Sequence, residues 1–334
     1  MITSLTAAAD DDGRRLDRVL RKAMPDTALS AIHRLLRKGA VRVNGEIAAA
    51  NRRIRTGENI SVTSVISVIP VISAISAIPV PPSLSKHTFP EILFEGEGLL
   101  ILNKPAGLSV HGGGSSLKSP EKENLQGLVY AYLKPKLPPS LSFRPGPLHR
   151  LDQPSSGVIV FSTNLQGARF FSELMKKRKI KKYYLTLLEG KIEKAEIWQD
   201  ELVRDQRLKK SFAKTENGKT AKAAKAALTR ISPIAVNAGF SLVLAEIETG
   251  RTHQIRAQAA SRGYPLLGDS KYGSSSKHRG FLLHAWKMKF PDDFHYASLP
   301  CLIEAPLPQS FQNAVSKLFG KDTLKLLNTA PVIL

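Results

Sequence analysis

The sequence predicts an α+β fold in which a small N-terminal unit precedes a larger one. The prediction rests on apolar side chains at helical spacing, on a hairpin pattern and on short apolar strands followed by turn residues. Residues 14–22 and 30–39 have the helical pattern, residues 41–47 the hairpin pattern, and residues 158–161 and 240–247 the strand pattern. At 334 residues the chain is long enough for a large core and more than one domain.

The first sixty residues contain two short helices and a hairpin. Residues 14–22 place leucine and valine on one helical face. The second helix, residues 30–39, is expected to begin with Ser30 as its N-cap and to close with Gly39 as its C-cap. Asn44-Gly45 is the dipeptide most typical of a two-residue hairpin turn.

An uncharged segment separates the two units. From Ile66 to Ile78 an isoleucine occurs at every third position. Polyproline II has about three residues per turn, so this spacing predicts an extended linker. A membrane span is one alternative, because residues 59–85 carry no charge, but Pro70 and Pro79 argue against it. A repeat expansion without function is the other alternative.

Asp152 lies in a turn rich in proline, serine and glycine, directly before an apolar strand. It follows Leu151 and precedes residues 158–161. Packed apolar neighbours on both sides would hold its carboxylate in one position, as catalysis requires. Asp152 is therefore a candidate catalytic residue, and a turn aspartate that caps the strand is the alternative.

A second polar segment, residues 248–256, follows the alternating strand 240–247. A helix is expected to begin at Arg256 and to end at a glycine and a proline. Arg251 and Arg256 thus lie where a strand leads into a helix. A guanidinium keeps its charge, so one of them placed beside Asp152 would fix the orientation of the carboxylate. The alternative is a surface ion pair of little energetic value.

These segments resemble the RluA-type pseudouridine synthases. The motifs of that family occur in the family's order and span most of residues 90 to 310. They are an opening motif at residues 91–108 followed by 110–111, a catalytic motif at 149–157, a tyrosine motif at 182–185 with 189–190, an arginine motif at 250–256 with 268–269 and 272–273, and closing motifs at 283–285 and 304–308.

The resemblance implies a role for four side chains. Asp152 is then the essential aspartate, and Arg150 beside it helps to hold the displaced base out of the RNA helix. Tyr184 stacks on the target base. Arg256, rather than Arg251, pairs with Asp152.

The resemblance also implies the architecture. Residues 89–334 would form a catalytic domain with a mixed or antiparallel central sheet flanked by helices. Residues 1–62 resemble the S-four-like fold, a small α/β RNA-binding domain, and residues 63–88 would be the linker. The chain departs from the family at Ser155 and Gln258, where threonine and histidine are usual.

Converting uridine to pseudouridine breaks the bond between ribose carbon 1′ and the base, turns the uracil and reattaches it through carbon 5. The reaction involves no redox change, so no cofactor and no metal are expected. Asp152 could act as a nucleophile at carbon 1′ or as a base that removes a ribose 2′ proton. A non-catalytic RNA-binding or ribosome-assembly protein is the main alternative, and it would not need Asp152, Tyr184 and Arg256 together.

The charge of the chain indicates a nucleic-acid partner. It has 49 lysines and arginines against 28 acidic residues, a formal net charge of +21. Large-subunit ribosomal RNA is the expected substrate, and transfer RNA stays open. The basic residues expected to contact RNA are Arg14, Arg15, Arg18, Arg34, Arg37, Lys38, Arg42, Lys182, Lys209, Lys210, Lys219 and Arg251.

The remaining composition favours a cytoplasmic monomer without a membrane role. Cys301 is the single cysteine, which excludes a disulfide framework and fits a reducing compartment. The N-terminus lacks the basic and then apolar order of a secretion signal. The following histidines lack metal-ligand spacing and are expected to form hydrogen bonds: His111, His149, His253, His278 and His284.

Overall fold

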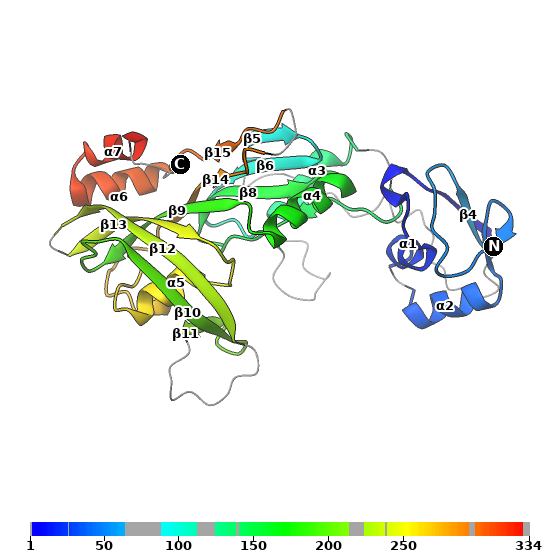
Figure 1. The fold of residues 1–334 in the computed structure, drawn as a ribbon, viewed down its shortest axis with the longest axis horizontal. Helices are drawn as coiled ribbons and strands as arrows, with labels where there is room; N and C mark the ends of the chain where they lie inside the picture. Colours follow the sequence, from blue (N-terminus) through cyan, green and yellow to red (C-terminus); the bar gives the residue numbers. More distant parts are fainter. Residues whose placement is uncertain are drawn as a thin grey trace.

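The computed structural model describes residues 2–25, 27–63, 88–111, 124–137, 140–213, 224–237, 239–293 and 298–329. Within these residues the chain forms a four-stranded sheet near the N-terminus and an eleven-stranded sheet in the larger unit (Figure 1). The isoleucine repeat and Lys219 lie outside the described residues. None of the helices described is both long enough and apolar enough to cross a membrane.

The N-terminal sheet is antiparallel throughout, in the order β1-β4-β2-β3. The turn between β2 and β3 has positive φ at both Asn44 (51°) and Gly45 (86°), which confirms the predicted hairpin. Two helices pack on this sheet and form a separate apolar core with it. The elements are β1 (Ile2–Thr6), a 3-10 turn η1 (Ala9–Asp11), α1 (Leu16–Ala23), α2 (Leu29–Arg37), β2 (Val41–Val43), β3 (Glu46–Ile47) and β4 (Asn59–Thr63).

Helix α2 differs from its predicted ends. Its N-cap is Ala28, so Ser30 lies in the first turn and does not cap the helix. Its C-cap is Lys38, and Gly39 follows at a φ of +66°. The buried face of α2 sets the register of the helix on the sheet, and a serine costs little inside the first turn, so its ends shift by one or two residues.

Buried polar contacts join the N-terminal domain to the larger one. The carboxylate of Asp11 is fully buried, accepts a hydrogen bond from the Ser142 hydroxyl and accepts another from the Leu141 amide at 3.1 Å. Arg14 donates to the Ser142 carbonyl oxygen at 3.2 Å. Asp10 accepts from the first amide of a helix in the larger domain at 2.7 Å. Arg14, which we expect to bind RNA, therefore also contributes to this interface.

The larger sheet is mixed, which confirms the predicted α+β class. Its order is β11-β10-β12-β13-β9-β14-β8-β6-β5, with β15 on β14 and β7 on β8. The pair β14 and β8 is parallel, and the other pairs are antiparallel. The strands are β5 (Glu91–Gly96), β6 (Leu99–Lys104), β7 (Gly146–Pro147), β8 (Ser156–Ser162), β9 (Lys181–Glu189), β10 (Glu196–Asp205), β11 (Lys210–Ala213), β12 (Lys225–Val236), β13 (Phe240–Ile247), β14 (Leu283–Lys289) and β15 (Leu302–Glu304).

Helices cover both faces of this sheet (Figure 1). Apolar side chains of α3 and α5 share one core cluster with the sheet, whereas α4 packs in a second cluster and α6 with α7 in a third. The elements are α3 (Leu125–Leu133), α4 (Leu165–Lys176), α5 (Gln254–Ser261), a 3-10 turn η3 (Ser270–Tyr272), α6 (Gln309–Phe319) and α7 (Thr323–Thr329).

Strand β13 is covered on both faces of the sheet. Strand β13 reads as alternating, yet nearly all of its side chains are buried. Leu242 and Leu244 point to the α6 face, whereas Val243 and Ala245 point to the α5 face. Because β13 lies near the middle of the sheet, both of its faces are covered, and the alternation in the sequence does not mark a solvent side.

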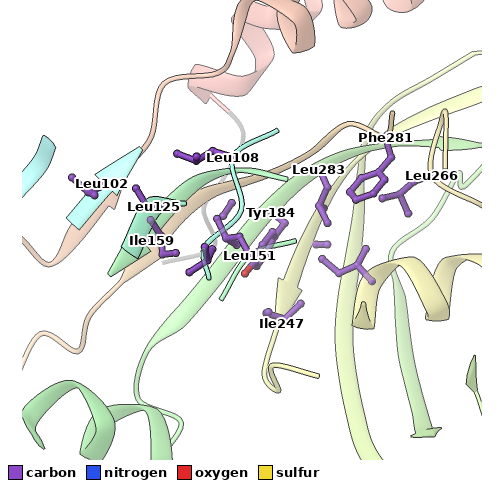
Figure 2. Close-up of a cluster of buried hydrophobic side chains, with 14 of the residues drawn as sticks. Leu102, Leu108, Leu125, Leu151, Ile159, Tyr184, Ile247, Leu266, Phe281 and Leu283 are labelled. Carbon is purple, nitrogen blue, oxygen red and sulfur yellow. The ribbon is translucent and has the colours of Figure 1, made fainter. Parts of the chain in front are cut away.

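Consecutive tyrosines of β9 also point to opposite faces. Tyr183 belongs to the cluster under α6, and Tyr184 to the cluster under α3 and α5. Figure 2 shows Tyr184 in this second cluster, with Leu151 and Leu283 nearby. The two-residue period of a strand therefore places the Tyr184 ring on the face where Asp152 lies.

Candidate active site

Two histidines, the partly buried His149 and the fully buried His284, anchor the segment that carries Asp152. His149 accepts a hydrogen bond from the Val160 amide at 3.1 Å, and burial lowers the pKa of His149 to about 3. At the other end of the segment, Ser156 and Nδ1 of His284 are 2.9 Å apart. The next residue, Gly157, has a φ of +106°, and a Cβ there would lie 2.1 Å from the Ala285 carbonyl oxygen. The backbone on both sides of Asp152 is thus tightly constrained.

Acid should destabilise the protein through His284. This side chain is buried between Ser156 and the Ala305 carbonyl oxygen, and burial lowers its pKa to about 4. The unfolded histidine titrates near 6.5, so the unfolded state binds a proton first as the pH falls, and stability present above pH 6.5 is lost towards pH 4. We expect this one histidine to cost about 2 kcal/mol between pH 7 and pH 5. Urea denaturation of the wild type and of His284→Gln at both pH values measures the difference.

The exposed His278 provides the control for that measurement. His278→Gln should lose as much stability on acidification as the wild type does, whereas His284→Gln should lose about 2 kcal/mol less. An equal pH dependence in His284→Gln and the wild type would contradict the prediction.

Lys104 ties the segment to the loop that follows β6. Its side chain is fully buried, and its ammonium donates to the carbonyl oxygens of Pro105 (2.9 Å), Leu108 (2.8 Å) and Gln153 (3.1 Å). Burial lowers the pKa of Lys104 to about 7, although the charge of Asp152 acts in the opposite direction. Lys104 is part of the opening motif, but the sequence alone does not indicate that it holds the residue after Asp152.

Arg256 joins two carboxylates. Its Nη1 lies 2.8 Å from Oδ2 of Asp152, as the sequence predicts for Arg256 rather than Arg251. Its Nε and Nη2 lie 2.6 and 2.9 Å from the two carboxylate oxygens of Asp269. Arg256 and Asp269 are both buried, and the ring of Phe281 covers the guanidinium at 4.1 Å. The planar guanidinium is therefore fixed by Asp269 and in turn orients Asp152.

Helix α5 begins two residues earlier than predicted, at Gln254. The side chain of Gln254 accepts from the Thr249 hydroxyl and from the Arg251 amide, which closes the turn before the helix. Gln258, where the family has histidine, is fully buried and donates to the Trp198 carbonyl oxygen at 2.9 Å. This departure from the family pattern therefore supports the packing of α5 on the sheet.

His253 belongs to the site although the sequence does not single it out. Its Nε2 is 3.8 Å from Oδ1 of Asp152, and its Nδ1 is 2.9 Å from the Tyr272 hydroxyl. Burial lowers the pKa of His253 to about 4, so the ring is neutral at neutral pH. Its φ of 55° is a left-handed conformation that costs energy for a residue with a Cβ. The sequence signal that could have identified His253 as a site residue is its position inside the arginine motif, residues 250–256.

Tyr184 and Asp152 line the same pocket, together with Arg150, Ile247 and Leu283. The Tyr184 ring is 8% exposed, and burial together with the charge of Asp152 raises the pKa of its hydroxyl. This pocket is small, about 60 Å³, whereas a cleft of about 1200 Å³ lies between the two domains. Asp152, Arg256 and Tyr184 line the small pocket and not the large cleft, so we place the active site in the small one.

The structure places the basic residues expected to bind RNA in different settings. Arg15 pairs with Asp17 at 2.8 Å, and Arg42 donates to the Gly45 carbonyl oxygen at 2.8 Å. Lys182 is 6% exposed, and burial lowers its pKa to about 8, so it is poorly placed to reach a phosphate. The exposed members of the set are Arg18, Arg34, Arg37, Lys38, Arg42 and Lys209.

The five histidines noted from the sequence each form a hydrogen bond. Besides the three described above, His111 pairs with Gln126, and His278 pairs with the Gly280 carbonyl oxygen. Within the part of the chain that the structure describes, no group of three or more metal-binding side chains occurs.

The fold and the site thus combine a mixed sheet with a carboxylate that an arginine holds in a pocket lined by a tyrosine, and three comparisons identify the class of enzyme. Residues 98–261 match the family model described as RNA pseudouridylate synthase, and residues 14–60 match the S4 domain. The ribosomal large subunit pseudouridine synthase C of Vibrio cholerae is 31% identical over 92% of this chain and 95% of its own length. The chain belongs to the RNA pseudouridylate synthase family, and it is an RNA pseudouridine synthase.

Two further relatives and one solved structure are also similar to this chain over most of its length. The ribosomal large subunit pseudouridine synthase C of Escherichia coli is 30% identical over 93% of this chain and 94% of its own length. The ribosomal large subunit pseudouridine synthase D of Nitrosomonas europaea is 28% identical over 91% of this chain and 84% of its own length. The solved structure of human RNA pseudouridylate synthase domain containing 4 has the same fold, with a TM-score of 0.53, 21% identity, and coverage of 68% of this chain and 92% of that chain.

Proposed function

We propose that this protein isomerises a uridine of large-subunit ribosomal RNA and that Asp152 is its catalytic carboxylate. The observation that carries the proposal is the ion pair between Asp152 and Arg256, which lies in the pocket that Tyr184 lines. The substrate follows from relatives named as ribosomal large subunit pseudouridine synthases, which align over most of this chain. The S4 domain and the net charge of +21 support RNA as the partner.

The first step needs one oxygen of Asp152 near the ribose. Oδ2 accepts from Arg256, whereas Oδ1 is 3.8 Å from the ring of His253. Oδ1 is thus less engaged, and it either attacks carbon 1′ or removes the 2′ proton while the bond to the uracil nitrogen breaks. Arg256 stabilises the carboxylate in the orientation that this step requires.

The freed uracil must turn before carbon 5 bonds to carbon 1′ and the proton on carbon 5 leaves. Tyr184 offers an aromatic face next to Asp152, and Leu151 and Leu283 exclude water from that face. Arg150 is exposed at the mouth of the pocket and is suited to fill the gap that the displaced nucleotide leaves in the RNA.

We also propose that the enzyme acts without a cofactor, as a monomer and in the cytoplasm. The reaction is an isomerisation that consumes no second substrate, and ribosomal RNA is accessible there. We propose that the S4-like domain ends at residue 62 and that the catalytic domain begins at residue 89, after the linker of residues 63–88.

Mapping of pseudouridines in total RNA tests the proposed substrate. A strain that lacks the gene should lose pseudouridine at one or more positions of large-subunit ribosomal RNA, and the wild-type gene should restore it. The purified protein should form pseudouridine at the same positions in unmodified transcripts. If only transfer RNA changes, ribosomal RNA is the wrong substrate; if no RNA changes in cells or in vitro, the proposed function is wrong.

A further inference from the structure

Three basic side chains from separate elements gather beside the pocket of Asp152. Arg204, near the end of β10, is paired with Ser211, the residue that follows Lys210 on β11, and Lys271 lies in η3. The Lys271 ammonium donates to the Lys209 carbonyl oxygen at 2.9 Å, which joins η3 to the turn between β10 and β11. The Lys210 ammonium lies 4.6 Å from the centre of the Tyr272 ring. We call Arg204, Lys210 and Lys271 the basic cluster.

The basic cluster lacks a carboxylate partner. In the described portion of the chain, none of its three side chains takes part in an ion pair. The nearby carboxylates of Asp152 and Asp269 are bound to Arg256. Burial, and then repulsion from Arg256 and Arg204, lowers the pKa of Lys271. Like charges held together in this way create a site that an anion stabilises.

Tyr272 connects the basic cluster to the reacting carboxylate. The Lys210 ammonium lies 4.6 Å, and the guanidinium carbon of Arg256 4.8 Å, from the centre of its ring. Its hydroxyl is 2.9 Å from His253, whose other ring nitrogen is 3.8 Å from Asp152. Tyr272, and then His253 or Arg256, therefore separate an anion on the basic cluster from Asp152, which places that anion outside the reacting centre, where a phosphate that flanks the nucleotide in the pocket would lie.

We propose that Arg204, Lys210 and Lys271 bind a phosphodiester group next to the target uridine. The inference rests on the proposed function, because the uridine must occupy the pocket of Asp152. A phosphate is the fitting ligand, since its non-bridging oxygens carry negative charge and accept hydrogen bonds from the guanidinium and ammonium groups of the cluster. The basic cluster positions the RNA backbone and does not contact the reacting atoms. Binding there holds the extruded nucleotide over Tyr184.

A double variant, Arg204→Gln with Lys271→Gln, tests the site. Its matched control is Lys194→Gln with Lys317→Gln, which also removes two exposed cations. Lys194 lies just before the start of β10, at the end opposite Arg204, and Lys317 lies on α6. On a transcript that contains the target, the test variant should raise KM about tenfold and leave kcat within about twofold of the wild type. The magnitude of its slope of log affinity against log salt should fall by about 1, as expected for the loss of one phosphate contact, whereas the control should match the wild type.

A chemical change in the RNA distinguishes binding of one phosphate at the basic cluster from nonspecific electrostatic attraction between the protein and RNA. A methylphosphonate removes the charge of a single phosphate, and it is placed in turn on the 5′ and on the 3′ side of the target uridine. One of the two positions should weaken wild-type binding about tenfold and should not weaken the double variant further. Additive losses at both positions, or a double variant that behaves like its control, would overturn the proposed phosphate site. Wild-type protein that forms no pseudouridine on the unmodified RNA would instead refute the proposed function.

Discussion

The Asp152→Asn variant is expected to fold, to bind RNA with near wild-type affinity and to form no pseudouridine. The amide has almost the shape of the carboxylate, but it is a poor nucleophile and a poor base. Arg256 keeps its two hydrogen bonds to Asp269, so the local structure should persist. We expect single-turnover rates to fall by at least about 10⁴-fold, as when the reacting group of other enzymes is removed.

The single-turnover rate is measured as pseudouridine formed over time with the enzyme in saturating excess over a ribosomal transcript, and RNA affinity is measured separately by filter binding. Asp322→Asn is the matched control, because it removes a carboxylate that is 90% exposed and lies in the C-terminal region. Turnover by Asp152→Asn within about tenfold of the control would remove Asp152 from the mechanism.

The Arg256→Lys variant should lose both stability and activity although it keeps the positive charge. A lysine ammonium is a point charge and cannot bond Asp269 through two nitrogens while it also reaches Asp152. Because Asp269 is 2% exposed, weakening its ion pair leaves a buried charge poorly compensated. We expect the free energy of unfolding to fall by about 3 kcal/mol and kcat to fall at least about 100-fold.

Arg262→Lys on the same helix is the control for this prediction. Arg262 pairs with Asp200 at 2.9 Å, but its side chain is 26% exposed, so the exchange should cost less than about 1 kcal/mol. Urea denaturation gives the stability of each variant, and steady-state kinetics under folding conditions give kcat and KM. If Arg256→Lys has wild-type kcat, Arg256 does not position Asp152 for the reaction.

The local elements were predictable where short-range signals are strong. The Asn44-Gly45 turn and the bounds of β13 agree with the sequence pattern, because a turn dipeptide and an apolar run act on their own residues. The ends of α2 and the start of α5 were not predicted correctly. Those ends depend on partners elsewhere, as Gln254 shows by bonding both Thr249 and the backbone of β12.

The catalytic motif identified Asp152, and family resemblance connected it with Arg256 across 104 positions of sequence. The supporting residues were not predicted. Asp269 and Lys104 occur in recognised motifs, but only their burial and hydrogen bonds show that they fix Arg256 and the backbone beside Asp152. The juxtaposition of Arg204 and Lys271 was not predicted, because the strand and the 3-10 turn that carry them are far apart in sequence.

The sequence by itself determined the class of enzyme, the candidate catalytic aspartate and the basic character of the chain. These properties reside in short motifs and in composition, which do not depend on how distant segments pack. The tertiary structure decided which face of β9 meets the carboxylate, which arginine Asp269 holds, and which cations lie together without an ion-pair partner among the residues that the structure describes. Those properties depend on the pairing of remote strands, and the burial that results controls the strength of each charge interaction.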